Sequence, residues 1–298
     1  METPCSAQHT DCGVYATAAT LYVGNNTHIM EAYSASDKEP PKGMFPWVLK
    51  VFRTFVGHKA GDVAELRHLT SMAPHPGLLG APVCVTSLRG FPAAVFPRFP
   101  TDLFAVVLER HEELTGGPTL DMCRHVFKQL AWAVKHCHDC GLAHLDIKLE
   151  NVFVRHEAAG DDGPAHDWSS VRTVLGDFEF AMSTAGRCVR AVGTTGYQAP
   201  ELLKLRQSSE GSSVAPAPCD VWSLGILLCV VITGQQINFS NGVVCLDYVL
   251  SKARKANATR SAEAMSRLQD LLQAMLQPNP RRRATMDDVV SHPWVARE

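Results

Sequence analysis

The stretch His144-Leu145-Asp146-Ile147-Lys148-Leu149-Glu150-Asn151 decides the fold, because it brings three chemically different side chains into one short segment. Asp146 can accept a proton, Lys148 can bind a phosphate group and Asn151 can ligate a cation. Phosphoryl transfer needs these groups, since there the protein mainly positions the partners and neutralises charge. The stretch therefore predicts a phosphoryl-transfer site.

The same residues resemble the H-R-D-x-K-x-x-N catalytic loop of eukaryotic-type protein kinases, with Leu145 where that family usually has Arg. The resemblance implies that Asp146 is the catalytic base, that Lys148 neutralises the moving phosphoryl group, and that Asn151 ligates Mg²⁺. Lys148 also favours Ser/Thr over Tyr as the acceptor. Because the usual Arg binds a phosphate on the activation segment, Leu145 predicts activity that does not depend on such a phosphate.

Residues 175–179 (LGDFE) resemble the D-F-G segment of the family, so Asp177 is expected to be the other metal ligand. Glu179 stands in place of glycine. Its presence removes backbone freedom, and it puts an acid near the metal site unless the side chain points away.

Residues 193–201 (GTTGYQAPE) resemble the substrate-docking segment of the family. The resemblance implies that Thr194 bonds near Asp146 and Lys148, again favouring Ser/Thr substrates. It also implies a structural ion pair between Glu201 and Arg283, which would support the fold because losing either member strands a buried charge. Asp220 is expected to anchor the backbone of the catalytic loop.

Residues 47–52 (WVLKVF) form an apolar run interrupted by one charge, which predicts a strand. A buried Lys50 is costly unless it is paired; taken alone, the run also fits an edge strand with Lys50 in water. The kinase resemblance implies that Lys50 reaches the α- and β-phosphates of ATP and pairs with Glu65 in a helix over 60–70. A solvated Glu65 is the alternative.

Residues 12–23 alternate in a way that predicts two short strands or a hairpin, and the aperiodic stretch 25–46 predicts a long loop. The ATP-covering glycine-rich loop, G-x-G-x-x-G-x-V, then falls on Gly13, Tyr15, Ala18 and Thr20. Only its first glycine is present, which weakens the expected grip on phosphate.

Residues 97–102 match the hinge between the strand-rich and helix-rich halves, where the backbone of Phe99 is expected to bind adenine. Asp102 either reaches the ribose or caps the next helix, and the cap is favoured. Thr119 and Gly141 are the expected start and stop of a core helix over 120–137.

Ordered motifs from Lys50 to Trp294 predict a single α+β protein kinase domain over 1–298 with a bilobal fold. We expect an N-lobe over 12–96, made of an antiparallel sheet with one helix, and a mainly helical C-lobe over 103–298. Surface insertions are expected at 25–46, 156–170 and 205–218.

The composition and net charge limit the classes of binding partner that we expect for this chain. The chain has 298 residues, 46% of them hydrophobic, and a net charge of -2, which favours neither nucleic acid nor a membrane surface. The run 281–283 is read as a solvated basic turn. The apolar run 221–233 has about 13 residues, whereas a membrane span needs roughly 20. His136, Cys137 and Cys140 lack a second ligand pair, which argues against zinc.

No signal peptide is visible, so the ten cysteines are expected to be reduced in the cytoplasm or nucleus. With ATP and Mg²⁺, or Mn²⁺ in its place, the chain is expected to phosphorylate Ser and Thr of protein substrates. The alternative is a pseudokinase acting as a protein-binding scaffold. The degraded glycine-rich loop and D-F-E segment are also similar to kinases of large DNA viruses such as herpesviruses, in which case the compartment is the host cell.

Overall fold

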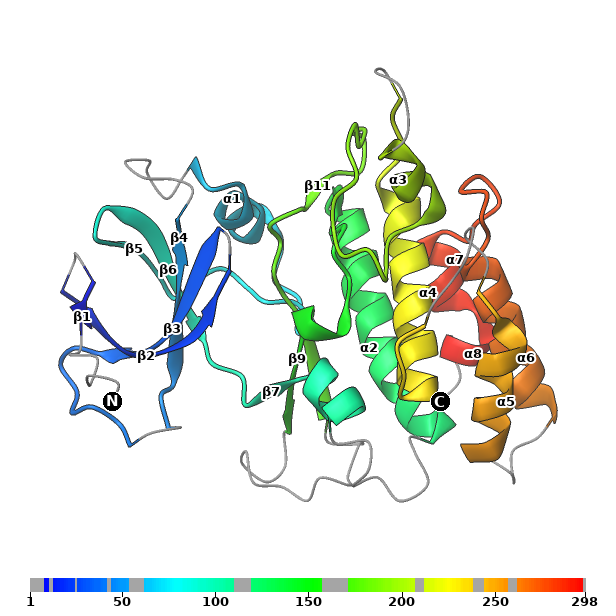
Figure 1. Cartoon of the computed structure of the whole chain (residues 1–298), viewed down its shortest axis with the longest axis horizontal. Coiled ribbons are helices and arrows are strands. Elements are labelled where there is room, and N and C mark those ends of the chain that lie inside the picture. Colours follow the sequence, from blue (N-terminus) through cyan, green and yellow to red (C-terminus); the bar gives the residue numbers. More distant parts are fainter. Residues whose placement is uncertain are drawn as a thin grey trace. The chain divides into compact units, whose positions relative to one another are not determined.

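The computed structural model describes residues 8–10, 13–24, 26–41, 44–53, 62–109, 119–156, 171–206, 212–237, 244–256 and 262–296. The chain divides into two compact units. Unit 1 consists of Met1–Ser71 and Gly80–Phe99, and unit 2 of Met72–Leu79 and Pro100–Glu298. Unit 1 is built mainly of strands and unit 2 mainly of helices (Figure 1), which is the α+β composition expected from the sequence.

Unit 1 holds a six-stranded antiparallel sheet in the order β1-β2-β3-β4-β6-β5, together with helix α1. Alternate residues of its central strands, such as Leu49 and Val51, form one buried cluster. Because successive side chains of a strand point to opposite faces, Lys50 leaves the sheet on the other face. The elements are β1 Gln8–His9, β2 Tyr15–Val23, β3 Thr27–Ser34, β4 Trp47–Phe52, α1 Ala64–Ser71, β5 Cys84–Leu88 and β6 Phe91–Pro97.

The first hairpin differs from the sequence prediction. Residues 15–23 form one strand rather than two, and its partner β3 lies inside the stretch predicted as a loop over 25–46. That stretch predicted a loop because it is polar, contains proline and has no hydrophobic period. Glu31 is nevertheless buried, and Arg98, which lies 67 residues further along the chain, pairs with it.

Two helices form the centre of unit 2. Helix α2, Leu120–Asp139, begins at Thr119, whose hydroxyl accepts the Met122 N–H at 3.3 Å, and Gly141 follows it with φ 75°. This is the predicted cap and stop. Helix α4, Ala217–Thr233, contacts α2 and is buried from Cys219 to its last residue, as the apolar run predicted.

The other elements of unit 2 surround these helices. Two small sheets have the strand orders β10-β9-β7 and β11-β8. The strands are β7 Thr101–Asp102, β8 Leu142–Ala143, β9 Val152–His156, β10 Val171–Leu175 and β11 Met182–Ser183. The helices are α3 Pro200–Leu205, α5 Leu246–Ala256, α6 Ala262–Met275, α7 Met286–Ser291 and α8 Pro293–Ala296, with a π-helical turn at Ala105–Glu109 and a 3₁₀ turn at Leu149–Asn151.

All three expected insertions lie partly outside the described residues, and for 25–46 these are residues 25, 42 and 43. Most of 156–170 lies outside them, since β9 ends at His156 and β10 begins at Val171. For 205–218, residues 207–211 are outside, but Val214 pairs with Cys188 of the activation segment. Within the described ranges, no helix has the length and apolar character that a bilayer crossing requires.

Candidate active site

Asp220 in helix α4 holds the backbone of the catalytic loop by hydrogen bonds. The carboxylate of Asp220, which is fully buried, accepts the N–H of His144 at 2.8 Å and the N–H of Leu145 at 2.7 Å. The ring of His138 in α2 lies 2.9 Å from the same carboxylate. Asp220 thus fixes the path of the loop, in the place that the sequence predicted for it.

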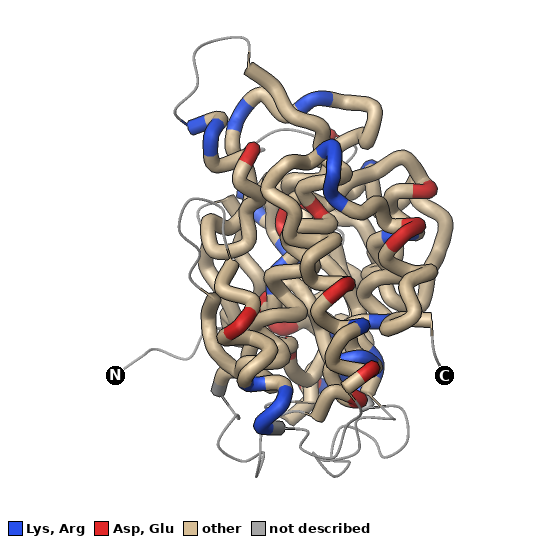
Figure 2. Tube along the Cα trace, turned by 90° about the vertical axis from the view of Figure 1, so that its right-hand side faces the viewer, with Lys and Arg blue, Asp and Glu red and all other residues tan. Residues whose placement is uncertain are grey.

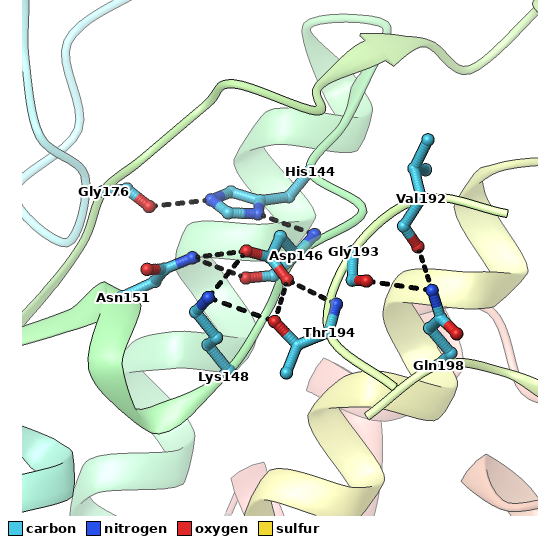
Figure 3. A network of polar contacts seen from close by, with 9 residues as sticks. All are labelled: His144, Asp146, Lys148, Asn151, Gly176, Val192, Gly193, Thr194 and Gln198. Carbon is cyan, nitrogen blue, oxygen red and sulfur yellow. Dashed lines mark hydrogen bonds and ion pairs between the residues drawn. The ribbon is translucent and has the colours of Figure 1, made fainter. Parts of the chain in front are cut away.

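The ring of His144 joins the loop to the segment that carries Asp177. Its Nδ1 accepts the Asp146 N–H at 3.2 Å, so Nε2 carries the proton and donates to the Gly176 carbonyl at 2.9 Å (Figure 3). The ring of Phe178 lies 4.7 Å away from that of His144, between centroids. These contacts set the distance between the catalytic loop and residues 176–178.

The carboxylate of Asp146 receives four hydrogen bonds from the residues that the sequence had grouped with it. Its Oδ1 accepts the backbone N–H of Thr194 at 2.8 Å and the Thr194 hydroxyl at 2.7 Å. Its Oδ2 contacts Lys148 Nζ at 3.0 Å and Asn151 Nδ2 at 3.1 Å. Figure 3 shows all three side chains converging on Asp146. A buried carboxylate with this many donors is held in one orientation.

Lys148 is protonated at neutral pH. Burial alone would lower the pKa of Lys148, but the nearby carboxylates, Asp146 foremost, outweigh it and raise this pKa above its ordinary value. Its ammonium group also donates to the Thr194 hydroxyl at 3.0 Å. Lys148 therefore supplies a fixed positive charge beside the proposed base.

Asn151 and Asp177 offer the oxygens that a hard divalent cation prefers. Asn151 spends its N–H groups on the carbonyl of Asp146, at 2.8 Å, and on its carboxylate, so the amide oxygen faces away from Asp146 (Figure 3). The Gly176 N–H donates to the Asn151 carbonyl at 2.9 Å, which brings Asp177 next to Asn151. The donor set fits Mg²⁺ or Mn²⁺.

Lys50 and Glu65 form a buried ion pair within unit 1. Nζ of Lys50, in β4, lies 2.9 and 2.8 Å from the two carboxylate oxygens of Glu65, in α1. Both residues are less than one tenth exposed, so the alternatives of a solvated Lys50 or a solvated Glu65 are wrong. The pairing removes the cost of the charge within the apolar strand.

The glycine-rich loop was placed wrongly. Gly13 precedes β2, with φ 69°, while Tyr15, Ala18 and Thr20 lie inside that strand rather than in a turn. A loop that covers phosphates has to be a turn between strands, and the turn before the strand next to β4 lies between Val23 and Thr27. Gly24 is in this turn. It was not predicted as a loop glycine because both strands of the hairpin were expected within 12–23, whereas the second strand is β3.

The remaining expected residues lie as follows. Phe99 is the last residue of unit 1 before the chain passes to Pro100. The Asp102 carboxylate accepts the Ala105 N–H at 2.9 Å, which is the favoured cap; contact with a ribose stays a prediction. Glu201 in α3 pairs with Arg283 through contacts of 2.6 and 2.9 Å.

Comparison with known proteins agrees with this geometry. The protein kinase domain family matches residues 99–295, and the chain therefore belongs to the protein kinase family. It is 29% identical over 182 residues to testis-specific serine/threonine-protein kinase 2 of Mus musculus, covering 59% of this chain and 45% of that protein. It is also 32% identical over 184 residues to CBL-interacting protein kinase 29 of Oryza sativa subsp. japonica, covering 61% and 36%.

A third relative is meiosis-specific serine/threonine-protein kinase mek1 of Schizosaccharomyces pombe, 31% identical over 175 residues, which are 57% of this chain and 36% of that protein. The chain spans less than half the length of these curated relatives.

Proposed function

We propose that this protein transfers the γ-phosphate of Mg-ATP to Ser and Thr hydroxyls of other proteins. The observation that carries the proposal is the Asp146 carboxylate, held by Thr194, Lys148 and Asn151 in one network. A buried base, a fixed cation and a metal-ligating amide around one point are what phosphoryl transfer requires.

In the proposed reaction the substrate oxygen attacks the γ-phosphorus while the bond from that phosphorus to the β–γ bridging oxygen breaks, and ADP leaves. Asp146 orients the hydroxyl and takes its proton late in the transfer. All four acceptor positions of Asp146 are occupied here, so the hydroxyl replaces one donor. Lys148 is the one expected to yield, because its ammonium is attracted to the transferring phosphoryl group.

The nucleotide-binding roles are assigned by residue. Asn151 and Asp177 would hold the divalent cation, which neutralises phosphate charge when bound. Lys50, oriented by Glu65, would contact the α- and β-phosphates. The backbone of Phe99 would meet adenine, and the turn with Gly24 takes the place first given to Gly13, Tyr15, Ala18 and Thr20.

A scaffold without activity is the second candidate. Glu179 in place of glycine and the single glycine in the hairpin turn favour it. The retention of Lys50, Asp146, Lys148 and Asp177 favours catalysis instead. Stabilisation of the protein by ATP that depends on Mg²⁺ separates a nucleotide-binding protein from one that does not bind nucleotide.

We further propose that the partners are proteins rather than nucleic acids or membranes, and that the protein acts in the cytoplasm or nucleus. The net charge of -2 supports the first point. Positive and negative residues are both spread along the tube in Figure 2, and neither sign covers it. Among the described residues, seven cysteines are free thiols, which supports a reducing compartment: Cys123, Cys137, Cys140, Cys188, Cys219, Cys229 and Cys245. The relatives named above come from a mouse, a plant and a yeast, so the resemblance to viral kinases stays a prediction.

The test is transfer of labelled γ-phosphate from Mg-ATP to a generic Ser/Thr protein, comparing the wild type with Asp146→Asn. We expect the wild type to be active and the variant to lose about 10²-fold or more, because general-base catalysis and orientation of the acceptor are both removed. Equal transfer by the two proteins, with Mg²⁺ and with Mn²⁺, would contradict the proposal and favour the scaffold.

A further inference from the structure

Gln198 makes two contacts that the sequence analysis gave no role. Its side chain is buried, and Nε2 donates one hydrogen bond to the Val192 carbonyl at 2.7 Å and another to the Gly193 carbonyl at 2.9 Å (Figure 3). Two carbonyls can be bonded only by the NH₂ end of the amide, which settles its orientation. One side chain therefore holds two successive peptide groups.

These two peptide groups lead directly to Thr194, whose N–H and hydroxyl both bond to Asp146. Residues 192–194 belong to no helix or strand of the described structure, so no regular backbone ladder fixes them. Gly193 has φ 82°, and a Cβ there would lie 2.2 Å from the Leu145 carbonyl oxygen. The segment thus runs directly against the catalytic loop, and a small shift of it would separate Thr194 from Asp146.

The catalytic-loop residue beside this segment, Leu145, cannot hold the segment by side-chain hydrogen bonds. Leu145 is apolar and 4% exposed, so its side chain donates no hydrogen bond to the segment. Gln198 instead keeps its Oε1 buried without a hydrogen-bond partner among the described residues. Leaving a buried acceptor without a hydrogen bond destabilises the folded state. The Oε1 end of the amide therefore destabilises the fold, whereas its Nε2 end holds the carbonyls of Val192 and Gly193.

We propose that Gln198 is a positioning residue for phosphoryl transfer: its amide fixes the 192–194 backbone, and through it the meeting of Thr194 with Asp146. The role of this contact in turnover rests on the proposed function. The placement of residues 192–194 by Gln198 does not depend on the proposed function.

The test replaces Gln198 with Met, which keeps the length and shape and removes both donors. The matched control is Gln129→Met. Gln129 in α2 is also a partly buried glutamine that holds backbone in unit 2, with contacts of 3.0 Å to the Val171 carbonyl and the Thr173 N–H. The printed hydrogen bonds of its side chain go to His125, Val171 and Thr173, none of which belongs to the Asp146 network. For the wild type and both variants we would measure kcat, the KM for ATP, the Tm and amide hydrogen exchange at Thr194.

For Gln198→Met we expect kcat to fall about 10-fold or more with the KM for ATP within about twofold of the wild type, since misplacement of a catalytic contact by about 1 Å is costly. Exchange at Thr194 is expected to accelerate about 10-fold. Gln129→Met should lower the Tm and leave both quantities near the wild-type values. A kcat for Gln198→Met within twofold of the wild type, or a loss equalled by Gln129→Met, would overturn the proposal.

The exchange measurement keeps the two proposals separable. If the wild type transfers no phosphate, the proposed function fails, while faster exchange at Thr194 in Gln198→Met alone still supports the positioning of the segment. Unchanged exchange at Thr194 would overturn the positioning role whether or not the protein is active.

Discussion

Gly193 lies in the segment 192–194, whose backbone runs directly against the catalytic loop at Leu145. A side chain there meets two obstacles, since its φ of 82° disfavours residues with a Cβ and the Leu145 carbonyl oxygen would be 2.2 Å from that atom. The backbone of the segment can approach Asp146 only because this position has no side chain.

Gly193→Ala is expected to push the segment away from Asp146 and to lower phosphate transfer about 10-fold or more. The left-handed conformation alone costs a residue with a Cβ about 1–2 kcal/mol, so the free energy of unfolding should fall as well. The control is Gly80→Ala, where the added Cβ meets nothing within 4 Å. Comparable activities of the two variants in a steady-state assay would show that the close approach is unimportant.

The sequence revealed the chemically active residues better than those that position them. Asp146, Lys148 and Asn151 could be found because their chemical types occur at short fixed spacings, and the structure brings them together. Gln198 could not, because its partners are backbone carbonyls, whose direction depends on the conformation of residues 192 and 193.

At the scale of single elements, helix α3 shows how a short helix is secured. It has six residues, too few to be stable alone, and Glu201 in its first turn forms a buried ion pair with Arg283. The Arg283 guanidinium also donates to the carbonyls of Gln277, at 3.0 Å, and Pro218, at 2.7 Å. A single side chain thus connects α3 with the first turn of α4 and with the segment between α6 and α7.

Arg283→Met is expected to reduce the free energy of unfolding by about 3–5 kcal/mol, because the Glu201 carboxylate is left buried without its counterion. Chemical denaturation measures this loss. Adding Glu201→Gln to the same variant removes the stranded charge and should recover part of the stability. If the double variant is less stable than Arg283→Met alone, burial of the charge is not the cause.

Strand β3 was missed for a reason that belongs to this scale. The polar, proline-containing and aperiodic sequence of 25–46 predicted a loop. The cation that compensates the buried Glu31, Arg98, lies beyond three further strands in the sequence. The same error moved the glycine-rich loop, since the hairpin turn could not be located without β3. Helices α2 and α4 were predicted correctly because their apolar patterns are local, and for α2 the stop at Gly141 is local as well.

For the whole molecule, burial divides the described cysteines into two chemical classes. Burial raises the pKa of Cys123 and of Cys229 to about 12, and it also raises the pKa values of the Cys137, Cys188 and Cys219 thiols. Cys140 and Cys245 are exposed. Since the thiolate is the reactive form, little of the buried class is ionised at neutral pH.

Alkylation at neutral pH is therefore expected to modify Cys140 and Cys245 within minutes and the five buried thiols only after unfolding. Site-resolved mass spectrometry of the folded and the denatured protein measures this difference. Rapid labelling of Cys123 or Cys229 in the folded protein would contradict the packing of α2 or α4.

Leu145 has a consequence for how activity is controlled. Gln198 holds the segment beside it through hydrogen bonds to two backbone carbonyls, and Thr194 holds it through hydrogen bonds to the Asp146 carboxylate. The apolar side chain at 145 has no affinity for an anion. Under the proposed function, we expect a protein built in this way to fold directly into its working conformation, without a phosphorylation step. The total activity would then depend on the amount of protein present. The rates of synthesis and degradation would therefore control it.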